Sequence, residues 1–198
     1  MKFFLSALRC ALGSGLLAAT MALPALAVDI GGVHLADAIK LGNADLKLNG
    51  AGIRTKIIFK VYAAGLYLTE KKSTVQEVLE AKGPRRVELI MLRDVSSADF
   101  TEGFLHGLSA NADNSEKAQL AGPTVKFSNL FNDTHSLKKG DVVTVDWLPG
   151  SGTLVQLNGK SLSEPLPDAA FYNALLKIWL GDNPADARLK PLLLGAKG

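Results

Sequence analysis

The sequence predicts an α+β fold in which helices pack on an antiparallel sheet. Residues 51–68, AGIRTKIIFKVYAAGLYL, form a long apolar run that is typical of a buried strand. Residues 141–148, DVVTVDWL, alternate in polarity and precede a Pro-Gly turn, which indicates adjacent antiparallel strands. Apolar side chains recur at helical spacing within 96–108 and 167–180, which indicates two amphipathic helices.

In the first half of the chain, short strands are predicted at about 28–35 and 45–48. Asn49-Gly50 is a tight-turn signal, so the strand at 51–68 is expected to form a hairpin with the strand before that turn. Ser73-x-x-Gln76 resembles a capping box, and Gly83-Pro84 would end the helix that it starts, at about 74–82. The apolar run at 86–92 predicts the next strand.

A longer helix is expected to follow, capped by Ser96 or Ser97. Its apolar stripe consists of Phe100, Phe104 and Leu108. Gly103 and Gly107 lie on a neighbouring stripe, where their small size would let the helix approach a sheet or a ligand closely. Residues 116–132 are predicted to be partly helical, with a break or kink at Gly122-Pro123.

The last part of the chain predicts an antiparallel meander and a helix. Turns at 149–152 and at Asn158-Gly159 separate the strand at 141–148 from a returning strand at 153–157. The helix at 167–180 has proline in its first turn and Gly181 at its end. The chain contains no repeat and no long linker, so residues 28–198 are expected to form one domain.

The strand at 51–68 is expected to have two different faces, because side chains on a strand alternate. Arg54, Lys56, Ile58, Lys60 and Tyr62 would share one face, and Ile53, Thr55, Ile57, Phe59 and Val61 the other, which would face the core. The first face is interpreted either as a solvated sheet surface or as a pocket wall whose guanidinium binds an anionic ligand.

Residues 1–27 are predicted to be a secretory signal peptide. Lys2 and Arg9 bracket a charged start, residues 10–23 are apolar or small, and Ala25-Leu26-Ala27 matches the cleavage pattern. The apolar run is shorter than the ~20 residues of a membrane span, so no stable membrane anchor is expected. The protein is therefore expected in the periplasm or outside the cell.

Cleavage after Ala27 would remove two basic residues and no acidic one, which changes 22 basic side chains to 20 against 19 acidic ones. A nearly neutral chain gives no electrostatic reason to expect nucleic acid or an anionic membrane as a partner. The only cysteine, Cys10, would leave with the signal peptide, so a disulfide cannot contribute to stability.

Several chemistries are not supported by the sequence. The histidines His34, His106 and His135 have no second ligand at metal-binding spacing, so no metal is expected. The segment 107–111, GLSAN, misses the G-x-S-x-G motif of serine hydrolases, and 50–52, GAG, begins a dinucleotide-binding motif without completing it. No cofactor is expected.

Two segments resemble the chalcone isomerase family. GAGIR at 50–54 and FKVYAAGLYL at 59–68 are similar to its arginine-bearing strand and its K-x-x-A-x-G-x-Y-L segment. Residues 158–195 are similar to the closing part of bacterial, exported chalcone isomerase-like proteins, with an NGK turn, a helix ending in WLG, and a following Pro and LK. The resemblance spans about 28–198 and implies an open-faced β-sandwich, with an antiparallel sheet and helices packed on it.

The resemblance also implies which catalytic groups are present. The plant enzymes cyclise a chalcone with an arginine near the phenolate and with a tyrosine and a threonine that hold a water on the ketone. Arg54 matches the arginine. Tyr62, Phe100, Gly103, Gly107 and Ile178 stand where the family has other polar groups. We therefore assign no catalytic residues.

The expected function is binding of a fatty acid or a similar amphipathic acid, as in the fatty-acid-binding relatives of this family, where an arginine and a tyrosine hold the carboxylate. The expected ligand-binding residues are Arg54, Tyr62, Phe100, Phe104 and Ile178. Arg54 could instead pair with Glu88 or Asp146 across the sheet, with Tyr62 as an ordinary strand aromatic. Two other functions remain open: an intramolecular lyase or isomerase acting through Arg54 and Tyr62, and a scaffold that docks a protein through Trp147 or Trp179.

Overall fold

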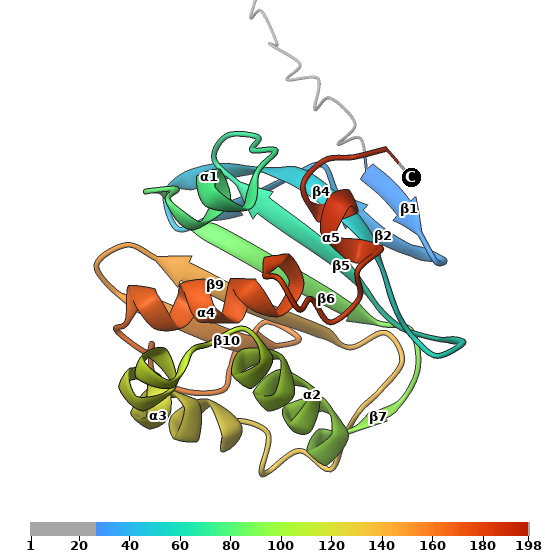
Figure 1. Ribbon diagram of the computed structural model, residues 1–198. Helices are drawn as coiled ribbons and strands as arrows, with labels where there is room; N and C mark the ends of the chain where they lie inside the picture. The colour runs from blue at the N-terminus through green and yellow to red at the C-terminus, as the bar shows by residue number, and fades with distance from the viewer. Residues whose placement is uncertain (1–26, 198) are drawn as a thin grey trace, which may run out of the picture.

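A curved, seven-stranded antiparallel sheet lies at the centre of the structure, a computed structural model that describes residues 27–197 (Figure 1). Its strands follow the order β11 (Lys160–Ser161), β10 (Gly152–Leu157), β9 (Val142–Leu148), β6 (Arg85–Met91), β5 (Phe59–Leu68), β4 (Ala44–Lys56) and β3 (Ala38–Leu41). Two small antiparallel pairs join β1 (Ala27–Ile30) to β2 (Val33–Ala36) and β7 (Val95–Ser96) to β8 (Ser136–Leu137). Residues 1–26 of the predicted signal peptide lie outside the described residues.

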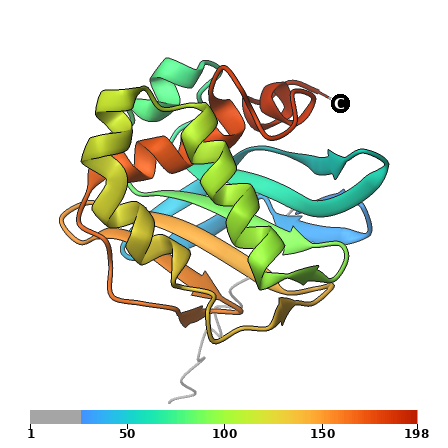
Figure 2. The same ribbon diagram turned by 60° about the horizontal axis from the view of Figure 1, so that its bottom comes forward.

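Helices cover one face of this sheet, as Figures 1 and 2 show. They are α1 (Val75–Leu79), α2 (Ser97–Ala110), α3 (Asn114–Ser128), α4 (Ala169–Leu180) and α5 (Leu189–Leu193). Side chains cap the three long helices: Ser96 accepts a hydrogen bond from the Asp99 amide, Asp113 from Glu116, and Asp168 from Ala170 and Phe171. Within residues 27–197, no helix is long and apolar enough to cross a membrane. The predicted α+β fold with helices on an open antiparallel sheet is confirmed.

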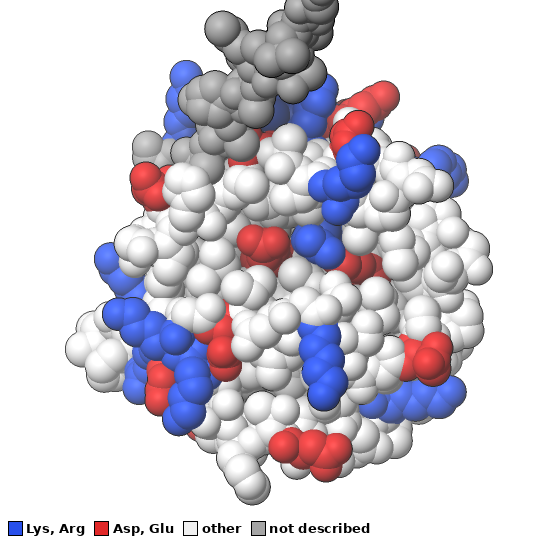
Figure 3. All heavy atoms as spheres, turned by 180° about the vertical axis from the view of Figure 1, so that it is seen from behind, with Lys and Arg blue, Asp and Glu red and all other residues white. Residues whose placement is uncertain are grey.

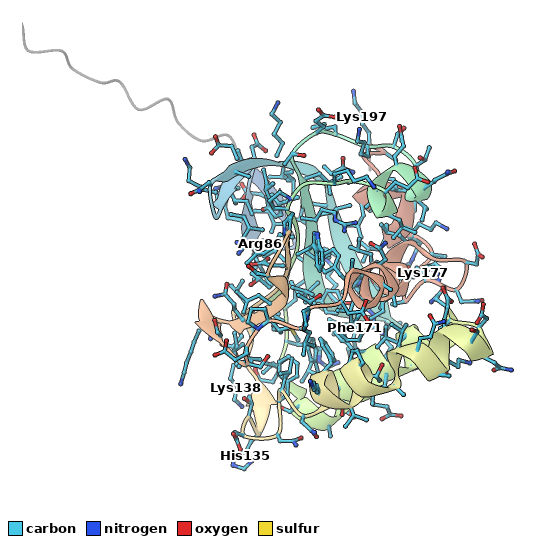
Figure 4. All side chains as sticks on the ribbon, turned by 90° about the vertical axis from the view of Figure 1, so that its left-hand side faces the viewer. Arg86, His135, Lys138, Phe171, Lys177 and Lys197 are labelled. Atoms are coloured by element: carbon cyan, nitrogen blue, oxygen red, sulfur yellow. The ribbon has the colours of Figure 1, made fainter. Side chains whose placement is uncertain are left out.

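The main core lies between the sheet and the helices. Figure 4 shows Phe171 of α4 in this layer, where its side chain is fully buried and packs on Phe127 of α3 with ring centroids 6.0 Å apart. Further aromatic rings, Phe100, Phe104, Phe127, Phe131 and Trp179, continue the cluster across α2, α3 and α4. Burial of one such side chain stabilises the fold by about 1.5–3 kcal/mol, which explains how a chain without disulfides holds together.

The opposite face of the sheet carries a smaller core under the β1–β2 hairpin, and it includes Leu35, Leu46 and Tyr67. Arg86 lies on this side of the sheet, away from α4 (Figure 4). Its guanidinium donates two hydrogen bonds of 2.6 Å to the fully buried carboxylate of Asp146 on β9. Such a buried pair fixes the register of β6 against β9, since removing one partner would leave an uncompensated charge.

The prediction of one strand at 51–68 is wrong. Strands β4 and β5 form a hairpin that turns at Ile57-Ile58, between two halves of this segment. Because the apolar pattern continues through the turn, neither glycine nor proline marks the reversal in the sequence. The predicted alternation of faces is therefore lost beyond Lys56.

Asn49-Gly50 does not form the predicted turn, because both residues lie inside β4. Asn49 is buried and donates hydrogen bonds from its side chain to the carbonyls of Lys72 and Leu193. A Cβ atom at Gly50 would collide with the backbone of α5. Asn49 and Gly50 therefore pack α5 against β4. In the sequence alone, the same two residues have the pattern of a tight turn.

Three other local predictions need correction. The segment 28–35 is a hairpin of β1 and β2, which turns at two glycines with positive φ, Gly31 and Gly32. Helix α1 is shorter than predicted, and its capping box uses Thr74 and Glu77, one residue after the predicted pair. Thr74 is the N-cap because its hydroxyl accepts a hydrogen bond from the Glu77 amide, while the Glu77 carboxylate accepts one from the Thr74 amide.

Pro123 also does not break its helix, since α3 runs continuously from Asn114 to Ser128. The ring of a proline normally clashes with the backbone and Cβ of the residue before it, and here that residue is Gly122, which has no Cβ. Leu120 and Phe127 are buried on either side of the proline and hold both halves of the helix in place. Packing thus offsets the ~3 kcal/mol that a proline costs in a helix interior.

Candidate functional site

A pocket of about 310 Å³ opens between the β4–β5 hairpin, the first two turns of α2 and the end of α4. Its inner walls come from buried residues: Val61, Tyr62, Phe100, Phe104 and Ile178. Its mouth is lined by exposed residues: Lys56, Ile57, Phe59, Arg93, Asp94 and Asp99. The pocket thus joins an apolar interior to a charged rim, an arrangement common in sites for small ligands.

Arg54 and Tyr62 lie side by side in this pocket because they are cross-strand partners on β4 and β5. The guanidinium carbon of Arg54 lies 5.5 Å from the centroid of the Tyr62 ring, within the range of a cation–π contact. Directly after this pair the register shifts, since Thr55 pairs with Lys60 and leaves Val61 as an extra residue. This bulge lets two consecutive residues, Val61 and Tyr62, line the same pocket, which regular alternation would forbid.

A loop before α5 fixes the strand next to the bulge. The carboxylate of Asp186 accepts a hydrogen bond of 2.9 Å from the backbone amide of Thr55 and further hydrogen bonds from Arg188. Burial alone would raise the pKa of Asp186, but these hydrogen bonds and the Arg188 charge lower it below its ordinary value. A charged Asp186 therefore fixes the backbone of Thr55, which directly follows Arg54.

The Tyr62 hydroxyl is buried and accepts a hydrogen bond of 2.9 Å from the indole nitrogen of Trp179 on α4. Burial raises the pKa of Tyr62 above its ordinary value, although Arg54 and the hydrogen bond from Trp179 partly oppose this. Tyr62 is therefore a neutral phenol at neutral pH. Because its oxygen already accepts from Trp179, its own proton is available to donate to a ligand.

The Arg54 guanidinium also has unused hydrogen-bonding capacity. Its Nε is buried without a hydrogen-bond partner, and within residues 27–197 no carboxylate lies within 4 Å of the side chain. A buried donor left unsatisfied costs about 1–3 kcal/mol, and more for a charged group. A bound anion would remove this cost.

One wall of the pocket is aromatic and aliphatic. Phe100 and Phe104 lie one turn apart on α2 with ring centroids 4.9 Å apart, and Phe104 packs edge-on against Trp179 at 5.6 Å. Phe104, Trp179, Tyr62 and Arg54 thus form one continuous series of contacts from α2 to β4.

The two glycines of α2 play different roles. A Cβ atom at Gly103 would meet nothing within 4 Å, so this glycine leaves space open in the pocket. A Cβ at Gly107 would lie 2.8 Å from Ile178, so that glycine permits the close packing of α2 on α4.

The charged side chains that line the pocket are three basic ones, Arg54, Lys56 and Arg93, and two acidic ones, Asp94 and Asp99. Asp94 is hydrogen-bonded to Lys138 and to the Lys139 amide, and Asp99 to the Ser96 hydroxyl. By contrast, Lys56 and Arg93 form no ion pair within the described part of the chain, and the Arg93 guanidinium lies 4.7 Å from the Phe59 ring centroid. With one more basic than acidic side chain in its lining, the pocket favours anions.

The structure brings all five predicted ligand-binding residues, Arg54, Tyr62, Phe100, Phe104 and Ile178, to this one pocket. Their contact with a ligand remains a prediction. The alternative in which Arg54 pairs with Glu88 or Asp146 is wrong, since Asp146 is paired with Arg86 on the far face. The predicted alternation places Val61 on the opposite face, and no sequence pattern points to Arg93 or Asp186.

Trp179 is not at the surface, where the scaffold hypothesis requires it in order to dock a protein. It is 1% exposed and packs in the core, so it cannot serve that role. The signal that could have shown this is the nearly apolar segment around it, ALLKIWL at 174–180, in which Lys177 is the only polar residue and which is typical of a largely buried helix. Trp147 is partly buried against Tyr172, with ring centroids 5.9 Å apart.

Among residues 27–197, no group of three His, Cys, Asp or Glu side chains could hold a metal ion. The side chains that line the pocket can donate hydrogen bonds, balance a negative charge and enclose an apolar body. This combination suits a molecule with one acidic end.

Comparisons with known proteins agree with the fold. The sequence profile described as chalcone isomerase-like matches residues 27–195. Among solved structures, a fatty-acid binding protein of Arabidopsis thaliana matches with a TM-score of 0.67 and 18% sequence identity, over 85% of this chain and 96% of that one. The sequence has no match among curated proteins. At this level of identity, the structural match shows the fold alone.

Proposed function

Because this chain belongs to the chalcone isomerase-like family, we propose that it binds a small amphipathic acid, with a fatty acid as the main candidate, and that it does so without catalysis. The observation that carries the proposal is the Arg54 guanidinium, which has no partner among the described residues and lies against the Tyr62 ring at one side of an apolar pocket. A carboxylate is the anion whose geometry a guanidinium matches with two parallel hydrogen bonds.

The apolar wall and the polar pair of the pocket contribute to binding in different ways. Each methylene group that a ligand buries against Phe100, Phe104 and Ile178 contributes ~0.8 kcal/mol, whatever the ligand class. The charged hydrogen bonds at Arg54 and Tyr62 then select a ligand with an acidic end and fix its orientation. The same chain with an alcohol end should bind more weakly.

The pocket volume supports a ligand of modest size. About 310 Å³ lies at the lower end of the ~300–1,000 Å³ that is usual for small-ligand sites. We therefore expect a medium-chain acid to be enclosed more completely than a long-chain one. The structural neighbour named as a fatty-acid binding protein supports this class of ligand.

We also propose that the protein acts outside the cytoplasm, in the periplasm or in the secreted fraction. The support is the sequence pattern of residues 1–27, with its charged start, apolar run and Ala25-Leu26-Ala27 site. Intact-mass measurement of the exported protein is expected to give a chain that begins at Val28. A membrane-bound species that retains Met1 would contradict the proposal.

The test of ligand binding compares head groups at constant chain length. Octanoate, laurate and palmitate, and the matching alcohols, are titrated against a bound fluorescent fatty acid. We expect each acid to compete better than its alcohol. Among the acids, we expect laurate to show the highest binding free energy per methylene group. Mass spectrometry of the organic extract from natively purified protein is expected to detect an acid. Equal competition by acids and alcohols, with an empty extract, would reject the proposed function.

A further inference from the structure

The tip of the β4–β5 hairpin exposes large apolar side chains to solvent. Ile57 is 86% exposed, Ile58 77% and Phe59 52%, and they are consecutive in the chain. Single exposed apolar residues are ordinary on protein surfaces, but a contiguous group on a projecting element indicates an interaction site. Figures 1 and 2 show that this hairpin extends beyond the helical layer.

The residue type at the hairpin tip is unfavourable for the backbone conformation that it adopts. Ile57 has a φ of 59°, the left-handed region that β-branched residues rarely adopt. Tight hairpin turns of this kind favour asparagine, aspartate or glycine. An exposed isoleucine here makes neither the turn nor the core more stable, which leaves an external contact as its use.

Basic side chains surround the apolar tip. Lys56 and Lys60 flank it on the two strands, and Arg93 packs over the Phe59 ring. Figure 3 shows basic side chains gathered, with a few acidic ones, at the edge of the molecule where the hairpin projects. Lys56, Ile57, Phe59 and Arg93 also line the pocket mouth, so the tip and the entrance form one surface.

We propose that this hairpin tip docks on the surface of an anionic phospholipid bilayer and holds the pocket mouth against it. Ile57 and Ile58 would enter the boundary between head groups and acyl chains, and the three basic residues would contact the head groups. Docking itself needs no bound ligand. Its use, the exchange of an acid between bilayer and pocket, rests on the proposed function.

Two arguments favour a bilayer over a protein partner. A stable protein interface covers about 800 Å² on each partner, which a projecting turn with two largely exposed apolar residues cannot provide. Shallow insertion of a few apolar side chains beside basic residues is instead typical of proteins that bind at membrane surfaces. The nearly neutral net charge does not oppose this, because electrostatic attraction to a bilayer acts within about 10 Å and depends on local charge.

The test is sedimentation with lipid vesicles, using the protein in the form in which its producing cells accumulate it. Vesicles of phosphatidylcholine with phosphatidylglycerol are expected to bind it more tightly than phosphatidylcholine alone, and added salt is expected to weaken the binding. Ile58→Ser should lower vesicle affinity about tenfold, since it removes one exposed aliphatic side chain from the contact. Lys60→Glu should lower it by at least about fivefold.

Matched control variants are available elsewhere in the same chain. Val125→Ser removes another exposed aliphatic residue, which is 60% exposed on α3. Lys160→Glu reverses a charge on β11, the edge strand far from the β4–β5 hairpin in the strand order of the sheet. Both controls are expected to bind vesicles like the wild type. Equal binding by the wild type and Ile58→Ser, or equal binding to neutral and anionic vesicles, would overturn the proposal.

Acid binding is measured separately, in buffer without vesicles, so that the two proposals can fail independently. Ile58 does not line the pocket, and Ile58→Ser should therefore bind laurate like the wild type. A wild type that sediments with anionic vesicles but binds no acid supports docking and rejects the proposed ligand. A wild type that binds laurate but does not sediment rejects docking alone.

Discussion

Arg54 and Tyr62 face each other across the β4–β5 hairpin, with the guanidinium carbon 5.5 Å from the phenol ring centroid. They share a face as predicted, but as partners on two strands and not as residues of one strand. The Val61 bulge and the hydrogen bond from the Thr55 amide to Asp186 fix the hairpin next to this pair. The pair is thus held by backbone contacts and by the hydrogen bond from Trp179 to Tyr62, while the Arg54 guanidinium and the Tyr62 hydroxyl proton remain available to a ligand.

Arg54→Ala is expected to weaken acid binding by more than tenfold while the melting temperature stays close to that of the wild type. Loss of a buried charge partner costs a bound carboxylate ~2–5 kcal/mol. Arg54→Lys should be intermediate, because an ammonium cannot form two parallel hydrogen bonds with a carboxylate. The measurement is fluorescent fatty acid titration with parallel melting curves.

The control for Arg54 is Lys160→Ala, a change of charge at the other side of the sheet. It should alter neither affinity nor stability by more than about 0.5 kcal/mol. Equal affinities for the wild type and Arg54→Ala would mean that Arg54 is a solvated strand residue. A large drop in its melting temperature would instead assign it a structural role.

Tyr62→Phe is expected to destabilise the fold by about 1–3 kcal/mol, because the buried indole N–H of Trp179 would lose its acceptor. Trp179→Phe also destabilises, through loss of packing on Phe104. The double variant should be more stable than the sum of the two single changes predicts, since it leaves no unpaired donor. Urea unfolding of all four proteins measures this coupling, and strict additivity would show that the hydrogen bond is not formed in solution.

Gly103→Leu is expected to block the pocket without destabilising the protein. A Cβ at Gly103 meets nothing within 4 Å, and replacing a helical glycine gains up to about 1 kcal/mol of helix propensity. Laurate affinity should therefore fall by more than tenfold while the melting temperature stays level or rises.

Gly107→Ala, one turn further along the same helix, provides the contrast. Its Cβ would lie 2.8 Å from Ile178, so we expect a loss of about 1–3 kcal/mol from overpacking. Unchanged laurate binding by Gly103→Leu would show that the ligand occupies another part of the protein.

The protein is expected not to accelerate the cyclisation of chalcone to flavanone. Phe100, Gly103 and Ile178 line the pocket where the catalytic members of the family, by the sequence resemblance, carry polar groups. Absence of one such donor typically lowers the rate ~10²-fold or more. A spectrophotometric assay against the uncatalysed reaction measures this. Acceleration by several orders of magnitude would show that other polar groups in the pocket, such as Tyr62, replace them.

The fold class, the family and the helices α2 and α4 could be predicted from the sequence alone. The stripes of Phe100, Phe104 and Leu108 and of Phe171, Leu175 and Ile178 predicted helices that the structure contains, because helical periodicity is a local property. The alternation in 141–148 likewise predicted β9 and its neighbour β10. The resemblance to the chalcone isomerase family selected the five candidate pocket residues.

The turn at Ile57-Ile58 and the contacts of Asn49, Gly50 and Trp179 became visible only in the three-dimensional structure. The turn has no sequence signal, since its residues are apolar and β-branched, and Asn49-Gly50 carries a turn signal but packs against α5. The contacts of Asn49, Gly50 and Trp179 join residues far apart in the chain. Such contacts override local preferences, because the free energy of packing exceeds the ~1 kcal/mol range of strand propensity.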